Sequence, residues 1–198
     1  MPNEDSYIID GKEYIRVTRV LDVIAKPELY RWIGKYGWDY CEGVKDKRAS
    51  FGTRVHKEIQ NYLSGDEVWV DSEEMRHTMA LFVSWACSNR LLPVHLEHRV
   101  ISDSFMFGGT ADFIGDFNDK RTLIDWKTSK YVFDHYKLQV VAYAMALEEM
   151  GEEPVEQCKI VSIRDGGITS GLIKREEFED LYKVFLCARR IYKWKYGK

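Results

Sequence analysis

One stretch of the sequence, residues 108–128, most constrains the fold, because it has the pattern of two β-strands joined by a tight turn. Asn118-Asp119 is a turn dipeptide whose residues tolerate positive φ, and the runs on either side are apolar and β-prone. If these two residues form the whole loop, Asp112 on the first strand lies directly opposite Asp125 on the second. This is a non-hydrogen-bonded position, where facing side chains come closest.

Two facing carboxylates about 5 Å apart destabilise a sheet through their repulsion. A divalent cation between Asp112 and Asp125 would remove that cost, since hard cations prefer oxygen ligands. The carbonyl oxygen of Trp126 offers a further ligand, and Lys127 points to the same face as Asp125. The repulsion also predicts that Asp125→Ala spares stability while it abolishes any chemistry at the site. The hairpin therefore predicts a metal centre with a lysine beside it.

A metal ion held by two carboxylates, next to a lysine, suits the hydrolysis of a phosphodiester. The cation binds a phosphate oxygen and lowers the pKa of a water molecule. Lys127 is placed to orient that water or to stabilise the developing negative charge. An Asp-x-Lys triplet alone is weak evidence, so the prediction depends on the register with Asp112 and on the residues that follow.

A further carboxylate, Glu97, lies on an expected strand over residues 94–101. We expect Glu97 to pair near residues 109–110, within reach of Asp112. An exposed strand glutamate without a function fits the pattern equally well. Glu97 is therefore a candidate ligand that the spacing alone does not assign.

Three histidines are candidate ligands as well. His56 stands at the edge of the apolar stripe of an expected helix over residues 51–63, which follows a separate helix over residues 38–48. His95 shares the face of Glu97, and His98 lies on the other face. This spacing matches no familiar zinc pattern. A lone helical histidine is more often structural or exposed, so His56 depends on its context.

An expected helix over residues 135–150 carries Gln139 and Tyr143 on one stripe, at i, i+4 spacing. A buried amide and hydroxyl need polar partners. A metal-bound water or a substrate phosphate would supply them. The helix is thus expected to present these two side chains to the metal centre.

Charge is distributed unevenly, although the net charge is only −3. Residues 12–60 hold 11 Lys and Arg against 7 Asp and Glu, whereas residues 61–120 hold 4 against 10. A basic entrance that leads to an acidic centre fits this pattern, and so does ordinary solvated charge. The last helix ends in a tail of basic residues and aromatic rings, which suits single-stranded nucleic acid or simply a solvated helix end.

Length and composition indicate a soluble, cytoplasmic chain. A length of 198 residues suits one domain with a helical part. No apolar run approaches the ~18 residues of a membrane span, and the acidic N-terminus differs from a secretory or mitochondrial targeting segment. The four scattered cysteines show no C-x-x-C pairing, so we expect free thiols in the core.

Four segments resemble successive motifs of the PD-(D/E)XK nucleases, in the branch of the RecB-type nuclease domain. Their order, spacing and residue types agree over about residues 50–145. Residues 16–21 and 29–32 extend the likeness to the small phage and bacterial nucleases related to the mitochondrial genome maintenance exonuclease. The four motifs are Gly52-Thr53-Arg54-Val55-His56, Gly109-Thr110-Ala111-Asp112, Ile124-Asp125-Trp126-Lys127-Thr128 and Gln139-Val140-Val141-Ala142-Tyr143.

The resemblance implies roles for individual residues. Catalysis would involve Lys127, Asp125, Asp112 and Gln139. The ligands of Mg²⁺ or Mn²⁺ would be His56, Asp112, Asp125 and the Trp126 carbonyl, with Glu97 as a weaker candidate. Contacts to the substrate would come from Tyr143, Gln139 and Arg54. Relatives with an iron–sulfur cluster have a close trio of cysteines downstream, which this chain lacks, so we expect no cluster.

We therefore predict an α/β fold with the αβββαβ core of these nucleases, a central mixed sheet flanked by helices, in one domain over residues 1–198. A helical lobe would span about residues 1–92 and a catalytic core about residues 93–198. The predicted function is a divalent-metal-dependent exonuclease on single-stranded DNA with free ends, in DNA replication, repair or recombination, in a bacterial or phage-infected cell. The alternatives are a structure-specific or flap endonuclease and a catalytically silent nucleic-acid-binding module.

Overall fold

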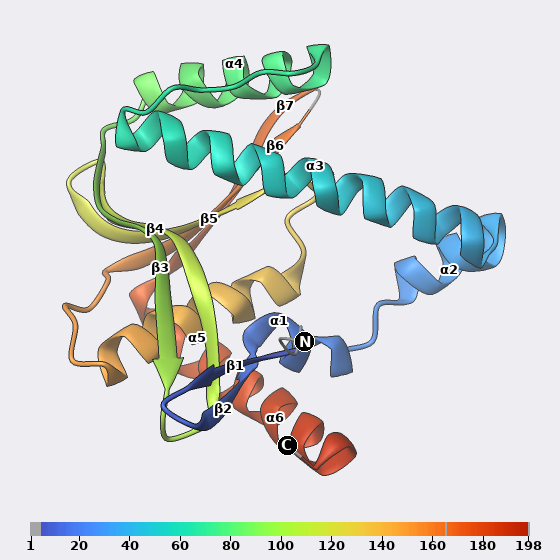
Figure 1. The fold of residues 1–198 in the computed structure, drawn as a ribbon. Helices are drawn as coiled ribbons and strands as arrows, with labels where there is room; N and C mark the ends of the chain where they lie inside the picture. The colour runs from blue at the N-terminus through green and yellow to red at the C-terminus, as the bar shows by residue number, and fades with distance from the viewer. Residues whose placement is uncertain (1–4, 165, 198) are drawn as a thin grey trace.

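A computed structural model describes residues 5–164 and 166–197. Its centre is a seven-stranded mixed sheet with helices on both faces (Figure 1). The strand order is β1-β2-β4-β5-β6-β7, and β3 pairs with β4. The strands are β1 (Ser6–Ile9), β2 (Lys12–Arg16), β3 (Leu91–Ser102), β4 (Phe107–Phe117), β5 (Lys120–Lys127), β6 (Gln157–Arg164) and β7 (Gly167–Lys174).

The helices alternate with these strands as the αβββαβ core requires, so the predicted fold class is confirmed. None of the helices within the described residues has the length and apolar character of a membrane span. The α-helices are α1 (Val17–Val20), α2 (Pro27–Tyr36), α3 (Trp38–Ser64), α4 (Glu73–Cys87), α5 (Asp134–Glu149) and α6 (Phe178–Tyr196). Two 3-10 helices are η1 (Leu21–Val23) and η2 (Arg175–Glu177).

The central hairpin has the predicted register. Asn118 and Asp119 form the turn with φ values of 51° and 64°, which their short polar side chains tolerate. The ladder between β4 and β5 runs from the pair Phe117–Lys120 to the pair Phe113–Ile124, where it ends. The two aspartates of the predicted metal centre are therefore the next residues beyond the last pair, where β4 and β5 begin to separate.

The two faces of the sheet form two hydrophobic cores. On one face, α3 and α4 cover a cluster that includes Trp126 and Phe113. On the other, α5 and α6 cover a cluster that includes Leu123. Figure 1 shows the two helical layers above and below the curved sheet. Because side chains alternate along β5, the residues on either side of Trp126 point toward α5.

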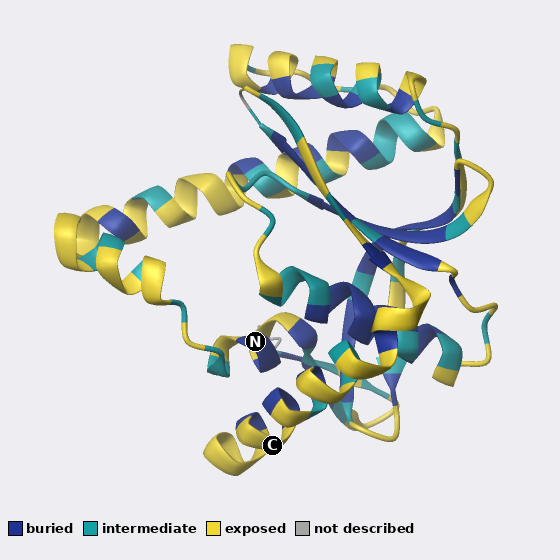
Figure 2. Cartoon of the chain, turned by 180° about the vertical axis from the view of Figure 1, so that it is seen from behind, coloured by how far each residue is buried: buried dark blue, intermediate teal, exposed yellow. Residues whose placement is uncertain are grey.

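Helix α3 is one continuous helix of 27 residues, so the expected division near residue 50 is wrong. No proline interrupts it, and the residue that ends it is Gly65, with φ of 77°. Its second half packs Val55 and Ile59 into the core, whereas α2 and the first half of α3 project from the body of the molecule. Figure 2 shows this projecting arm, residues 27–50, exposed on most sides.

The register of β3 differs from the prediction. Leu96 pairs with Phe113, so the next residue, Glu97, lies level with Asp112 rather than with residues 109–110. The register is constant from the pair Ser102–Phe107 to the pair His95–Ile114, so the four-residue connection 103–106 between β3 and β4 sets the level of Glu97. Strand alternation does not fix the length of the connection to the next strand.

The positive φ of 51° at Glu97 corrects the expected placement of two histidines. His95 and His98 lie on the same side of β3, with their rings stacked at a centroid distance of 4.4 Å. Both face Glu152, with Nε2 of His98 2.8 Å from Oε1 and Nε2 of His95 3.7 Å from Oε2. The left-handed residue between them, Glu97, breaks the alternation that would have separated them.

The N-terminal hairpin belongs to the main sheet. β1 pairs with β2, and β2 runs parallel to β4, with Ile15 opposite Phe107. The residues before β3 thus contribute two strands as well as the four helices that precede it. The division of the chain at about residue 92 stays a prediction.

The four cysteines divide into two groups. Cys41 and Cys158 are buried, as expected of free core thiols. Cys87 and Cys187 are exposed, which corrects the expectation for these two. Cys87 is the last residue of α4, and Cys187 lies midway along α6 on its exposed face.

Candidate active site

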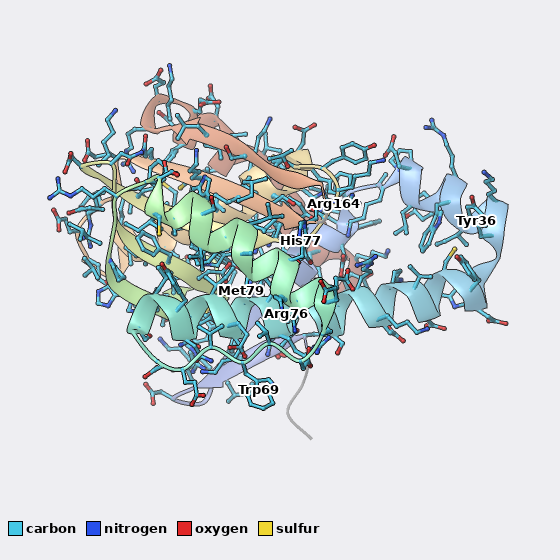
Figure 3. All side chains as sticks on the ribbon, turned by 90° about the horizontal axis from the view of Figure 1, so that it is seen from above. Tyr36, Trp69, Arg76, His77, Met79 and Arg164 are labelled. Carbon is cyan, nitrogen blue, oxygen red and sulfur yellow. The ribbon has the colours of Figure 1, made fainter. Side chains whose placement is uncertain are left out.

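Four of the predicted site residues line a cleft of about 2000 Å³, namely His56, Glu97, Lys127 and Gln139. The cleft is bounded by α3, by the segment from β2 to α2 and by the loop between β5 and α5. Figure 3 labels two of its lining residues, His77 of α4 and Arg164 of β6, and shows Tyr36 on the arm well away from both. Its lining holds eight Lys and Arg against four Asp and Glu, which suits a polyanionic ligand.

Asp112 of β4 is the residue that links α3 to the sheet. It is buried, and its Oδ1 lies 3.3 Å from Nδ1 of His56. Its Oδ2 accepts a 2.7 Å hydrogen bond from the backbone N–H of Trp126. This hydrogen bond continues the link between β4 and β5 beyond the last ladder pair, Phe113–Ile124. The carboxylate is thereby fixed in position from both sides.

Asp125 of β5 is only 1% exposed and faces α5. Its Oδ1 accepts a 3.0 Å hydrogen bond from Nε2 of Gln139, and the same nitrogen donates to the hydroxyl of Tyr143 at 3.1 Å. Its Oδ2 lies 2.5 Å from Nζ of Lys127. The polar partners expected for Gln139 and Tyr143 are therefore this carboxylate and each other.

Two glycines allow the elements to come this close. A Cβ at Gly109 would lie 2.1 Å from Cε1 of Tyr143, so only glycine lets the tyrosine ring lie on β4. A Cβ at Gly52 would lie 3.2 Å from the hydroxyl oxygen of Thr128, which is where α3 passes the end of β5. The glycines of two motifs thus serve close packing of the elements that carry the site.

Three side chains are arranged so that they could hold a metal ion. One ligand atom from each of His56, Glu97 and Asp112 lies within 4.8 Å of the others. Asp125 is not part of this group, because its oxygen atoms face Gln139 and Lys127. Two carboxylates and an imidazole are suitable ligands for Mg²⁺ or Mn²⁺, provided that water completes the shell.

The two residues of the His56–Asp112 pair stabilise each other's charged forms. Burial alone would lower the pKa of His56, but the charge and hydrogen bond of Asp112, together with the charge of Asp125, raise it. Burial alone would raise the pKa of Asp112, but His56 and Lys127 lower it. The contact therefore favours the ionic form of the pair.

The pKa values of Asp125 and Lys127 are both raised. Burial and the charge of Asp112 raise the pKa of Asp125, although Lys127 opposes them. The pKa of Lys127 is raised because the attraction of Asp125 and Asp112 outweighs burial. Burial, followed by the charge of Asp112, also raises the pKa of Glu97. Lys127 is thus a cation, which suits charge stabilisation rather than proton abstraction.

Arg54 is separated from this group of residues. Its guanidinium pairs with the carboxylate of Asp71 and lies 5.8 Å from the ring centroid of Phe51. It borders a smaller pocket next to the arm. The ring of Trp126 packs in the core, and the role of its carbonyl as a ligand stays a prediction.

Sequence reasoning did not single out several basic residues that line the cleft. They come from segments far apart in the chain, so no local pattern unites them. The excess of Lys and Arg over residues 12–60 was the available signal for most of them. They are Arg16, Arg19, Lys26, Arg48, Lys57, Lys130 and Arg164.

Comparison with known proteins identifies the family. A family model described as the PD-(D/E)XK nuclease superfamily matches residues 68–185. Among solved structures, a protein called SSO0001 is 18% identical, with 94% of this chain and 78% of that chain covered and a TM-score of 0.47. An alkaline exonuclease from Laribacter hongkongensis is 15% identical, with 91% and 90% covered and a TM-score of 0.40. No curated protein matches the sequence.

The family match spans more than half of the chain. It contains Asp112 and Asp125, Lys127 of the same strand, and the helix that carries Gln139. His56 lies before the matched residues and joins the site through α3. On these grounds the chain belongs to the PD-(D/E)XK nuclease superfamily of nucleic-acid hydrolases.

Proposed function

We propose that this protein is a divalent-metal-dependent DNA exonuclease that hydrolyses phosphodiester bonds in single strands with free ends. The observation that carries the proposal is the position of Asp112. Its carboxylate lies next to His56 and Glu97 on one side and next to the Asp125–Lys127 pair on the other. A group of ligands and a buried lysine therefore meet at one wall of a basic cleft.

The residues present fit Mg²⁺ or Mn²⁺. His56, Glu97 and Asp112 would supply one nitrogen and two carboxylate ligands, and Asp125 is close enough to Asp112 for the charge of Asp112 to raise its pKa. When bound, the cation supplies Lewis-acid stabilisation of the phosphate and activation of water. Burial, followed by the charge of Asp112, raises the pKa values of Glu97 and Asp125, so a cation beside these carboxylates would favour their charged forms.

The chain's own residues position and stabilise the reacting groups. Lys127 is held in place by Asp125 at 2.5 Å, so its ammonium group is available for the developing charge on the phosphate without reorganisation. Gln139 fixes Asp125 through a 3.0 Å hydrogen bond. Tyr143 in turn holds Gln139. The two α5 residues are thus positioning residues for the carboxylate. The ring of Tyr143 is buried, so its part is to hold Gln139 rather than to contact DNA directly.

Single-stranded DNA is the substrate that the shape of the cleft favours. Basic residues line it on two sides, with Arg16 and Lys26 from the N-terminal segment and Arg48 and Lys57 from α3. The base of the arm, residues 48–49, lines the cleft as well, and Figure 1 shows that the chain passes out through α2 and returns in α3. A single strand between two basic rows can neutralise its phosphates on both sides. A free end can enter such a bounded cleft most directly.

One assay tests the proposal against the alternatives. End-labelled linear single strands, linear duplexes and circular single strands are each incubated with the protein in Mg²⁺ and in chelator. We expect Mg²⁺-dependent degradation of the linear single strand and an intact circle. Cleavage of the circle would instead identify an endonuclease, and binding without cleavage in Mg²⁺ would identify a silent binding module.

A further inference from the structure

A cluster of aromatic rings lies beside the site, in the loop between β5 and α5 and the first turn of α5. The rings of Phe133 and His135 are stacked, with centroids 5.6 Å apart and an interplanar angle of 15°. Tyr136 meets Phe133 edge-on at 5.5 Å, and Tyr131 does so at 6.3 Å. This aromatic cluster, residues 131–136, is outside the motifs that identify the family site.

The aromatic cluster is continuous with the proposed catalytic lysine. Nζ of Lys127 lies 4.9 Å from the ring centroid of Tyr136. His135 and Tyr136 line the cleft together with Lys130. Lys130 in turn lies 5.3 Å from the ring centroid of Tyr131. The segment therefore holds two cation–ring pairs, Lys127 with Tyr136 and Lys130 with Tyr131.

Packing of the core explains only part of the aromatic cluster. Val132 and Tyr136 pack against the core beneath α5 and so anchor the loop. Tyr131 is 57% exposed and Phe133 is 38% exposed, so apolar ring surface faces water beside a polar cleft. Rings that do not serve the core, but lie next to cations, have the composition of a surface that binds single-stranded nucleic acid.

His135 contributes to the aromatic cluster as a ring rather than as a cation. Burial lowers its pKa, and the charges of Lys26 and Lys127 lower it further, although Asp22 and Asp134 oppose them. The imidazole is therefore neutral at pH 7. This leaves phosphate pairing to Lys127 and Lys130.

We propose that the stacked Phe133–His135 pair is a platform for a nucleobase adjacent to the phosphate being cleaved. The proposal rests on the proposed function, because it takes single-stranded DNA as the ligand. A base stacked on this pair fixes the nucleotide next to Lys127, so that its phosphate lies at the carboxylates. Base–aromatic stacking contributes enough for a loss of about tenfold in affinity when one ring is removed.

The test measures binding in chelator, where cleavage does not interfere. Fluorescence anisotropy gives the affinity for a labelled single strand and for strands in which one base-free residue is moved along the sequence. Phe133→Leu removes the ring but keeps an apolar side chain, and Phe133→Tyr keeps the ring. Trp69→Leu is the matched control, because Trp69 is 69% exposed in the acidic loop before α4, away from the cleft.

We expect Phe133→Leu to weaken binding of the intact strand about tenfold, with no change for Phe133→Tyr or Trp69→Leu. In the wild type, a base-free residue at one or two positions of the strand should weaken binding by the same factor. In Phe133→Leu, a base-free residue at those positions should not weaken binding further. If a base-free residue weakened binding equally in the wild type and in Phe133→Leu at every position, the platform would be overturned. A wild type that did not bind the intact strand would overturn it as well. A position-specific loss without any cleavage in Mg²⁺ would support the platform while rejecting the nuclease function, and cleavage without that loss would do the reverse.

Discussion

The ring of Tyr143 lies directly against the backbone of Gly109, so closely that a Cβ there would be 2.1 Å from Cε1 of the ring. Gly109 is followed three residues later by Asp112, and Tyr143 holds Gln139, which holds Asp125. The contact thus sets the distance between the strand and the helix that position the two carboxylates.

Gly109→Ala is expected to disturb this arrangement. The added methyl group overlaps the ring, so the free energy of unfolding should fall by about 1–3 kcal/mol, and cleavage should fall with it. Gly43→Ala is the control, since a Cβ at Gly43 meets nothing within 4 Å. The higher helix propensity of alanine should raise its free energy of unfolding by up to about 1 kcal/mol. Denaturant unfolding of both variants tests this. A Gly109→Ala protein as stable as the wild type would show that the ring can move freely.

Asp125→Asn is expected to inactivate the protein while its stability changes by less than about 1 kcal/mol. Burial and the charge of Asp112 raise the pKa of Asp125, so removal of its charge relieves an unfavourable burial. The same change leaves the ammonium group of Lys127, whose side chain is only 17% exposed, with a poorer partner. Asp180→Asn, at an exposed surface pair with Lys183, is the control and should change stability by less than about 0.5 kcal/mol. Denaturant unfolding measures both variants, and a loss of more than about 3 kcal/mol in Asp125→Asn would show that the pair with Lys127 outweighs burial.

Lys127→Met should separate catalysis from metal binding. Lys127 is not among the clustered ligands, so the affinity for Mn²⁺ should persist. The cleavage rate should fall by about 10²–10³-fold, as for the loss of one preorganised charge donor. Lys137→Met is the control, because Lys137 forms an exposed pair with Asp134 within α5. This variant should cleave at the wild-type rate. Loss of Mn²⁺ affinity in Lys127→Met would instead indicate a structural role for the lysine.

Metal affinity should depend on pH through His56. Its pKa is raised in the metal-free protein, because the attraction of Asp112 outweighs burial, so protons compete for the imidazole at and somewhat above its ordinary value of about 6.5. The affinity for Mn²⁺ should therefore fall as pH is lowered through this range, by up to about tenfold per pH unit for each proton displaced.

Calorimetric titrations of Mn²⁺ between about pH 6 and pH 8 measure this dependence. His56→Asn should bind more weakly and lose the steepest part of the slope, whereas His98→Asn, which pairs with Glu152 outside the site, should keep it. An unchanged slope in His56→Asn would exclude His56 as the competing group.

The parts of the site that could be predicted from sequence depend on local geometry. The register of Asp112 and Asp125 follows from the Asn118-Asp119 turn, because a two-residue loop leaves one regular pairing. The end of α3 at Gly65 is local in the same sense. Such features need only the residues beside them.

The parts that could not be predicted depend on tertiary packing. The level of Glu97 with Asp112 follows from the length of the connection between β3 and β4, residues 103–106, which a period of two does not reveal. Arg54 faces Asp71, a residue of a different segment, and so lies apart from the cleft. The continuity of α3 arises because its second half is held against the sheet, which outweighs the weak break signals near Ser50 and Gly52.

The most direct test of the central claim is the rate at which nucleotides are released from an end-labelled linear single strand. It is measured in Mg²⁺ for the wild type, for the wild type in chelator and for Asp112→Asn, whose carboxylate belongs to the ligand group. We predict rapid release in the first case and at least about a hundredfold less in the other two. Release at the wild-type rate in chelator, or by Asp112→Asn in Mg²⁺, would contradict a metal-dependent nuclease centre at Asp112.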